Sequence, residues 1–203
     1  MSKKKLSFLN YSDIGNIYKN LMKSKEYHDF KSLVLKKIKS KKTLFICGNG
    51  GSAANANHAA VDISNQIKFK NKRLARCVSL SSNIPMITAL ANDFGYENIF
   101  SMQLDSLGNK GDLLIVFSVS GSSPNVIRAA EKAKKKGIHV LSVSGFSGGK
   151  INKKSDVCIK FNSKNYGLVE DLQMIIIHNI CQDKFIWSEN FNERKFKNYF
   201  NFF

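Results

Sequence analysis

The chain has 203 residues, 43% of them hydrophobic, and this is enough to bury the core of one domain. No apolar run reaches the roughly 18–20 residues of a membrane-spanning helix, and no apolar segment with a cleavage site follows the basic N-terminus, so we expect neither a membrane protein nor a secreted one. The four cysteines lie far apart and form no CxxC pair, which excludes a zinc finger and favours a reducing, cytoplasmic location.

The net charge of +17 at pH 7 comes from 32 Lys and Arg against 15 Asp and Glu. Such a charge suits a polyanionic partner or an anionic substrate. The lysines, however, are scattered over expected helix ends and turns, and the joint abundance of Lys, Asn, Ile and Phe is what an AT-rich genome produces. The charge therefore does not predict a nucleic-acid partner, and we expect none.

Helices and strands are predicted to alternate along the chain. In chain order the expected elements are a helix over 11–38, a strand over 43–47, a helix over 53–67, a strand over 76–80, a helix over 85–92, a strand over 112–117, a helix ending at Lys136 before a Gly137 cap, strands over 139–143 and 157–161, and a helix over 169–185. Strands that are continuously apolar and alternate with helices indicate an α/β protein with a five-stranded parallel sheet covered on both faces, a three-layer α/β/α sandwich.

Two of these strands end in loops rich in glycine and serine, each followed at once by a helix. The loops are 48–52 (GNGGS) and 118–123 (SVSGSS). Glycine lets the backbone approach a ligand closely, and a helix N-terminus offers N–H groups with a partial positive charge. Both loops follow the carboxyl ends of strands, where open α/β sheets bind ligands. The pattern predicts a phosphate site; tight turns capped by Ser52 and Ser123 are the alternative.

The glycine spacing matches neither the GxGxxG nor the GxxxxGK[ST] pattern, so we expect no nucleotide cofactor. Candidate acid–base groups lie on two of the predicted helices. His58 and Asp62 are four residues apart and share a helix face. His178 lies in an apolar run, and Glu170 is eight residues before it, roughly 80° around the helix. An ordinary helix pair and a hydrogen-bonded core histidine are the alternative interpretations.

Three segments resemble signatures of the sugar isomerase (SIS) domain family, specifically its phosphoheptose isomerases. They are 47–58 (CGNGGSAANANH), 92–100 (NDFGYENIF) and 118–126 (SVSGSSPNV), in the family's order. Segment 166–181 falls where the family has its C-terminal catalytic helix. The resemblance implies a flavodoxin-like or Rossmann-like SIS domain with an N-terminal helix over 1–185. Residues 186–203 would be an aromatic-rich extension, either a helix that docks on a partner subunit or a poorly ordered tail.

The resemblance implies a cytoplasmic homotetramer that converts sedoheptulose 7-phosphate to D-glycero-D-manno-heptose 7-phosphate through an enediol, supplying ADP- or GDP-heptose for lipopolysaccharide or capsule. Its sites would combine neighbouring subunits. Carried over by motif, the sugar contacts are Asn49, Gly50, Gly51, Ser52, Asn92, Asp93 and Glu170, and the phosphate contacts are Ser118, Val119, Ser120 and Ser123. The base would be Asp62 and the acid His178. The zinc reported for some members would fall to His58, Asp62, Glu170 and His178.

The sequence departs from the family at two places. The family normally has glutamate where Asp62 stands, a side chain longer by one methylene. On the C-terminal helix, aligning Gln173 with the family glutamine puts Cys181 at the histidine position; we adopt the register that keeps His178 and puts Glu170 in place of the glutamine. Two other functions stay open: an isomerase of another phosphosugar, and a non-catalytic SIS scaffold similar to the replication-initiator-associating members.

Overall fold

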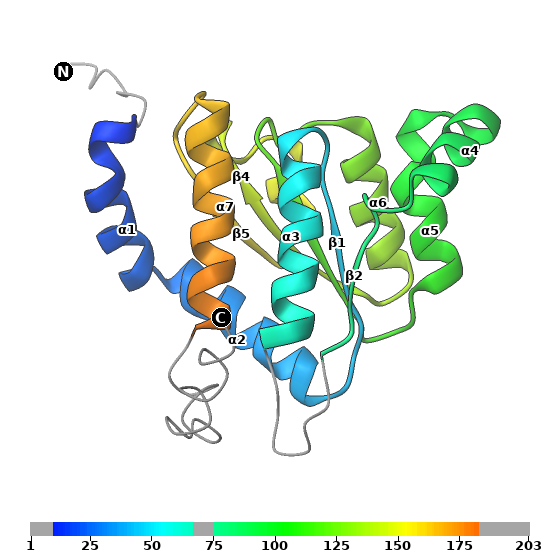
Figure 1. The fold of residues 1–203 in the computed structure, drawn as a ribbon, viewed down its shortest axis with the longest axis horizontal. Helices are drawn as coiled ribbons and strands as arrows, with labels where there is room; N and C mark the ends of the chain where they lie inside the picture. Colours follow the sequence, from blue (N-terminus) through cyan, green and yellow to red (C-terminus); the bar gives the residue numbers. More distant parts are fainter. Residues whose placement is uncertain (1–9, 67–74, 183–203) are drawn as a thin grey trace, which may run out of the picture.

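The computed structural model describes residues 10–66 and 75–182 of the chain. Within them, five strands form one sheet in the order β2–β1–β3–β4–β5, and every neighbouring pair is parallel (Figure 1). The strands are β1 (Leu44–Cys47), β2 (Cys77–Ser79), β3 (Leu113–Ser118), β4 (His139–Ser144) and β5 (Val157–Lys160). The five predicted strands and their parallel arrangement are confirmed.

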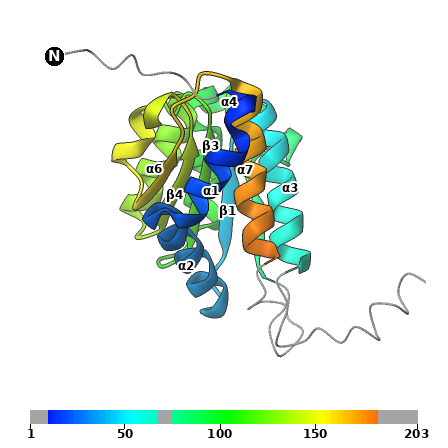
Figure 2. The same cartoon turned by 90° about the vertical axis from the view of Figure 1, so that its left-hand side faces the viewer.

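Helices cover both faces of the sheet. They are α1 (Ile14–Lys23), α2 (Lys25–Lys39), α3 (Gly51–Gln66), α4 (Ile84–Phe94), α5 (Ile99–Leu107), α6 (Pro124–Lys135) and α7 (Tyr166–Cys181), with short 3₁₀ turns η1 (Tyr11–Asp13), η2 (Tyr96–Asn98), η3 (Phe146–Gly148) and η4 (Lys150–Lys153). One core lies between the sheet and α1, α2, α3 and α7, and a second lies between the sheet and α5 and α6 (Figure 2). This is the expected three-layer sandwich.

Alternate residues of the central strands enter these two cores. On β1, Leu44 and Ile46 belong to the first core, and Phe45 and Cys47 belong to the second. All residues of β1 and β3 are buried. A strand buried on both faces must be apolar at every position, which is why these strands read as continuous hydrophobic runs.

The structure corrects two of the predicted helices and adds one that was not predicted. The expected helix over 11–38 is broken at Ser24, whose extended backbone ends α1 and whose hydroxyl oxygen accepts a hydrogen bond from the Tyr27 amide at 3.2 Å, capping α2. Helix α5 was not predicted. Helix α7 begins at Tyr166, because the Asn165 side chain caps it by accepting from the Leu168 amide at 3.1 Å. The predicted extension 186–203 and the end of the domain at residue 185 lie outside the described residues.

Strands β1 and β3 are neighbours, but the chain leaves β1 for β2 on the other side. Such a reversal of strand order opens a crevice at the carboxyl ends of the two strands, where open α/β sheets bind ligands. The loops after β1 and β3 are the two glycine- and serine-rich loops of the sequence. In the described part of the chain, no helix is long and apolar enough to cross a bilayer.

Candidate active site

The loops after β1 and β3 are joined by a pair of asparagine side chains. Asn49 Nδ2 donates to Asn125 Oδ1 at 2.9 Å, and Asn125 Nδ2 donates back to Asn49 Oδ1 at 2.8 Å. Tyr96, in η2, donates its hydroxyl to Asn49 Oδ1 at 3.1 Å. These contacts bring together the three segments that resemble family signatures.

The loop after β3 presents hydroxyl groups at the start of α6. Ser120 and Ser123 are half-buried, and Ser123 holds the N-cap position of α6 without a capping hydrogen bond from its side chain. The hydroxyl of Ser118 instead accepts from the Gly121 amide at 3.1 Å and supports the turn. Val119 is 3% exposed, and its carbonyl oxygen accepts from the Gly145 amide at 2.9 Å, so its side chain does not line the site. The Ser123 hydroxyl therefore does not cap α6, contrary to the alternative interpretation in which Ser123 is only a helix cap.

Glycine is needed where the backbone of the loop after β3 touches the backbone of the segment after β4. At Gly121, φ is +61°, and a Cβ there would lie 2.3 Å from the Gly148 carbonyl oxygen. The Gly121 carbonyl accepts from the Ile151 amide at 2.8 Å. No side chain fits between these segments, so the loop that follows β4 supports the loop that follows β3 from behind.

A carboxylate covers the first turn of α3. A Cβ placed on Gly51 would lie 2.3 Å from Glu170 Oε2, so the carboxylate of Glu170 sits directly on the Gly51 Cα. The Ser52 hydroxyl lies 3.5 Å from Glu170 Oε1. A carboxylate at a helix N-terminus is electrostatically favourable, and it disfavours a second anion at the same place. The two similar loops are therefore electrostatically different.

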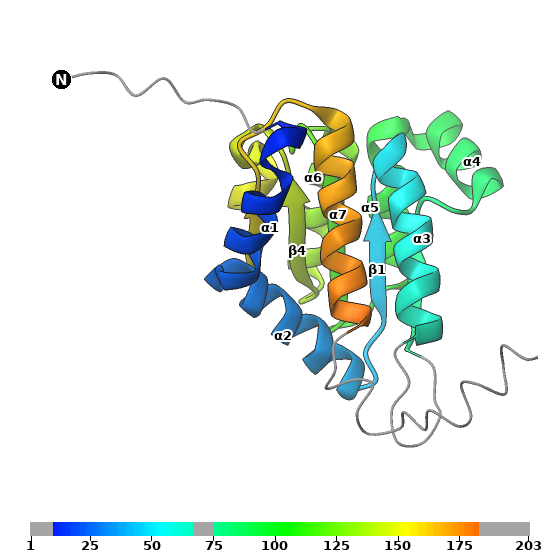
Figure 3. The same cartoon turned by 60° about the vertical axis from the view of Figure 1, so that its left-hand side comes forward.

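Helices α3 and α7 run side by side (Figure 3). Hydrogen bonds between their polar side chains form a seam along the contact. Gln173 is fully buried; its Nε2 donates to Ser52 Oγ at 3.2 Å and its Oε1 accepts from Asn55 Nδ2 at 3.0 Å. Asn55 Nδ2 also donates to the Glu170 carbonyl oxygen at 2.9 Å. These bonds fix the register of α7 against α3, because each buried polar atom would lose its partner if either helix slid.

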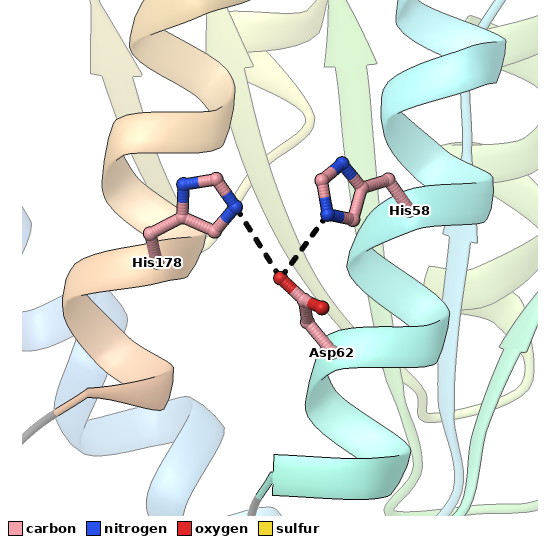
Figure 4. Close-up of side chains that lie close together, drawn as sticks. All are labelled: His58, Asp62 and His178. Carbon is pink, nitrogen blue, oxygen red and sulfur yellow. Dashed lines mark ion pairs between the residues drawn. The ribbon is translucent and has the colours of Figure 1, made fainter. Parts of the chain in front are cut away.

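Farther along the same seam, His58, Asp62 and His178 meet (Figure 4). Asp62 Oδ2 lies 3.4 Å from His58 Nε2 and 3.3 Å from His178 Nε2, and the two imidazole rings are 5.3 Å apart at 65°. Asp62 is 8% exposed, whereas His58 is exposed and His178 is half-buried. The expected shared face of His58 and Asp62 is confirmed, and His178 completes the cluster from α7.

Of the two registers considered for α7, the structure supports the one that keeps His178. The Cys181 side chain is fully buried in the core between the sheet and α7. Burial and the nearby charge of Asp62 raise the pKa of its thiol to about 12, so it stays protonated at neutral pH. Cys181 therefore cannot replace His178 as an exposed acid–base group.

The His58–Asp62–His178 cluster has the donors that zinc prefers. Two imidazole nitrogens and one carboxylate oxygen lie within 4.8 Å of one another, and three such ligands with an open fourth position are typical of catalytic zinc. The residues present thus fit the metal that the resemblance implies. Among the described residues, Glu170 is not part of this cluster, contrary to the expected fourth ligand, since its carboxylate is directed to Gly51 at the start of α3.

Asn92 and Asp93 lie in the last turn of α4, and both are exposed. Asn92 Nδ2 donates to Asp93 Oδ1 at 2.8 Å. Helix α4 has no buried side chain, and Tyr96 links the segment after it to the loop that holds Asn49, Gly50 and Gly51. Apart from Glu170 on α7, the predicted substrate contacts therefore come from the loop after β1, the loop after β3 and the end of α4. Tyr96 and Asn125 link these three segments through Asn49.

Sequence reasoning missed two residues of this network, Tyr96 and Asn125. Both stand inside segments that resemble family signatures, 92–100 and 118–126. Asn125 is 1% exposed in the first turn of α6. A polar residue at a helix position that faces the core was the available signal, since such a group needs a partner.

The chain resembles known proteins over most of its length. The family model described as SIS domain matches residues 14–145. A phosphoheptose isomerase of Helicobacter pylori (strain P12) is 40% identical over 149 residues, which cover 73% of this chain and 77% of that protein. One of Campylobacter concisus (strain 13826) is 37% identical over 150 residues, covering 74% and 79%.

Among solved structures, a phosphoheptose isomerase from Neisseria gonorrhoeae superimposes with a TM-score of 0.77 at 29% identity, covering 88% of this chain and 95% of that one. The fold, the signature loops and these relatives agree. The chain belongs to the SIS-domain family and, within it, to the phosphoheptose isomerases.

Proposed function

We propose that this protein isomerises sedoheptulose 7-phosphate to D-glycero-D-manno-heptose 7-phosphate, in the supply of nucleotide-activated heptose for lipopolysaccharide or capsule. The observation that carries the proposal is the contact between Asp62 Oδ2 and His178 Nε2, 3.3 Å apart on the seam that leads away from the loops of β1 and β3. A carboxylate beside an imidazole is the acid–base pair that such a reaction requires.

The phosphate is assigned to the loop after β3. Ser120 and Ser123 would donate hydroxyl hydrogen bonds, with backbone support from Ser118 and Val119, and the N-terminus of α6 would add its partial positive charge. The carboxylate of Glu170 at the start of α3 supports this choice, because it would repel a phosphate at the other loop.

The sugar is assigned to the space between this loop and the α3–α7 seam. Its hydroxyl groups would contact Asn49, Gly50, Gly51, Ser52, Asn92, Asp93 and Glu170. From Gly51 to His58 the axis of α3 rises by about 10 Å, a span comparable to an extended seven-carbon chain. A substrate held at its phosphate end could therefore bring its reacting carbons toward His58, Asp62 and His178.

In the proposed reaction, the Asp62 carboxylate takes a proton from C1 of the ketose, and the C1–H electron pair becomes the second bond between C1 and C2. The π electrons of the C2 carbonyl move to its oxygen, which takes up a proton and gives the enediol. Asp62 then delivers a proton, exchanged with solvent, to C2, and loss of the proton on the C1 oxygen leaves the carbonyl on C1 and completes the aldose. His178 moves a proton between the oxygens on C1 and C2, since its Nε2 lies beside Asp62. The phosphate contacts lie far from the reacting carbons and contribute binding energy that positions them.

His58, Asp62 and His178 would hold a zinc ion. When bound, such an ion supplies a Lewis acid that polarises the substrate carbonyl.

We also propose that the enzyme is a cytoplasmic homotetramer whose sites combine neighbouring subunits. Support comes from apolar side chains left uncovered near the site: Ile84 (69% exposed) and Phe94 on α4, and Val61 on α3. Apolar surface of this kind is typical of subunit contacts.

Proton NMR with sedoheptulose 7-phosphate in D₂O tests the function. An aldose anomeric signal, with solvent deuterium entering at C2, is expected. No turnover together with a substrate-induced rise in melting temperature would instead favour another phosphosugar, for which the shorter Asp62 is the specific indication. No turnover and no rise would favour a non-catalytic scaffold.

A further inference from the structure

We infer that Asn125 and Tyr96 are positioning residues that make Asn49 a hydrogen-bond donor only, toward an oxygen of the sugar. The inference rests on the proposed function, since it concerns how that substrate is held. It adds two residues to the site, one buried and one at its rim.

The carbonyl oxygen of the Asn49 side chain is fully used. It accepts from Asn125 Nδ2 at 2.8 Å and from the Tyr96 hydroxyl at 3.1 Å, and an amide oxygen has two lone pairs. The amide nitrogen has two hydrogens, and one is donated to Asn125 Oδ1 at 2.9 Å. One N–H is therefore left for a ligand, and no acceptor.

The orientation of this amide is fixed by its buried partner. Asn125 is 1% exposed, and its Oδ1 also accepts from the Val126 amide at 2.9 Å. This bond determines which end of the Asn125 amide is the oxygen. Turning the Asn49 amide over would set oxygen against oxygen and nitrogen against nitrogen. Buried polar groups that lose their hydrogen-bond partners destabilise the folded protein, so one orientation of the Asn49 amide prevails.

Tyr96 extends this control to the segment that carries Asn92 and Asp93. The Tyr96 side chain is 55% exposed, and α4 before it buries no side chain. The hydroxyl bond to Asn49 joins the segment after α4 to the loop after β1, and Arg128 of α6 holds the same segment through Glu97 at 3.5 Å and Asn98 Oδ1 at 2.9 Å. Tyr96 is thus the residue that connects this segment to Asn49.

Phosphate and sugar are therefore recognised by different residues, and only recognition of the sugar involves Tyr96. In the described structure, no hydrogen bond joins Ser120 or Ser123 to Tyr96, whereas the Tyr96 hydroxyl occupies the second lone pair of Asn49 Oδ1 and keeps Asn49 a donor only. Loss of the Tyr96 hydroxyl should therefore weaken binding of the whole phosphosugar and leave binding of phosphate alone unchanged.

The test compares Tyr96→Phe with Tyr18→Phe. Tyr18 is a matched control: it is also exposed and also donates its hydroxyl to an asparagine, Asn179 Oδ1, at 3.0 Å, but it ties α1 to α7 away from the loops. Kinetics give KM and kcat with sedoheptulose 7-phosphate, and calorimetry gives the Kd of inorganic phosphate. Tyr96→Phe is expected to raise KM roughly two- to tenfold, the effect of one hydrogen bond, with kcat, melting temperature and phosphate Kd unchanged.

Asn125→Asp is a second, stronger perturbation, because it replaces the Nδ2 donor to Asn49 Oδ1 with a carboxylate oxygen that repels it. In this variant KM is expected to rise more than tenfold. If this variant loses stability, Tyr96→Phe alone decides. A wild-type KM in Tyr96→Phe, or an equal loss of phosphate affinity, would overturn the positioning role while wild-type turnover upholds the proposed function. Absence of turnover in the wild type would contradict the proposed function, and with it this role.

Discussion

Asp62 and His178 come from different helices, and their side chains meet with Oδ2 and Nε2 3.3 Å apart. The same Asp62 oxygen lies 3.4 Å from His58 Nε2, so one carboxylate orients two imidazoles. The fully buried Gln173, bonded to Ser52 and Asn55, holds the two helices in the register that this contact needs. The geometry of the cluster is therefore a property of the α3–α7 seam as a whole.

Asp62→Asn is expected to lower kcat by about 10²–10⁴-fold, the usual contribution of a positioned base, because an amide cannot take up a proton from carbon. Melting temperature should stay within a few degrees, since asparagine has nearly the same shape. Asp62→Glu is the matched control: it keeps the carboxylate and should retain far more activity. Turnover by Asp62→Asn at the wild-type rate would show that Asp62 is not the base.

Zinc is expected to raise the melting temperature of chelator-treated wild type, because it would bind the folded cluster. His58→Ala and His178→Ala should lose this rise, while His28→Ala, on the exposed side of α2, should keep it. Thermal melts with and without zinc, together with metal analysis of the dialysed protein, measure the effect. Equal rises in all four proteins would place the metal elsewhere.

Ser120→Ala is expected to raise KM severalfold with a smaller change in kcat, because a phosphate contact binds ground state and transition state alike. Ser122→Ala is the control from the same loop. The oxygens of both serines accept from a backbone amide at 3.3 Å, that of Ser122 for Ser120 and that of Lys150 for Ser122, but Ser122 is exposed whereas Ser120 is half-buried. Steady-state kinetics on both variants decide. Equal KM values would remove Ser120 from the phosphate site.

Gly51→Ala is expected to cut kcat/KM by about 10–100-fold without unfolding the protein. The new methyl group would lie 2.3 Å from Glu170 Oε2. Because this carboxylate is on a flexible side chain, it can move away, so the fold is kept but the Glu170 carboxylate is displaced from the site. Gly15→Ala, where the added methyl group meets nothing within 4 Å, controls for helix propensity. In a Glu170→Ala background the Gly51→Ala change should cost little; a full additional loss there would mean that the methyl group acts on something else.

The free energy of unfolding is expected to fall as the pH falls through about 6.5, because of His139. Partial burial and the neighbouring charge of Lys37, whose Nζ lies 2.9 Å from His139 Nδ1, lower the pKa of this histidine. The unfolded chain then binds more protons than the folded one between the two pKa values, so acid favours unfolding.

His139→Gln keeps an acceptor for Lys37 and removes the titration. Denaturant unfolding of both proteins between about pH 5 and pH 7 should show a flatter dependence in His139→Gln. Identical slopes would mean that other groups cause the wild-type dependence.

The sheet and its loops were predictable because their signals are local. Each strand is a short apolar run that ends in small or polar residues, and parallel order follows from alternation with helices. Helix α5 was missed because buried polar residues interrupt its apolar pattern. Gln103 is 7% exposed and donates from Nε2 to the carbonyl oxygens of Leu80 and Ile99, at 3.0 and 2.9 Å, so a polar residue faces the core there.

The sequence predicted most residues of the candidate site, but not which of them contact each other. Glu170 and His178 share one side of α7, but eight residues of helix separate them by about 12 Å along its axis, so Glu170 lies against Gly51 and His178 beside Asp62. The Asn49–Asn125 pair joins the loop after β1 to the first turn of α6, and no spacing within either segment encodes such a contact. Contacts of this kind require the strand order.

Helix α4 carries Asn92 and Asp93 but buries none of its own side chains, and Ile84, Met86 and Phe94 stay 44–69% exposed. Its other face packs against the second core through the partly buried Ile87, Leu90 and Ala91, so the exposed side chains form a separate apolar face. If a second copy of the chain covers these side chains, specific activity will depend on enzyme concentration, and assays run at high dilution would understate the efficiency of the assembled enzyme.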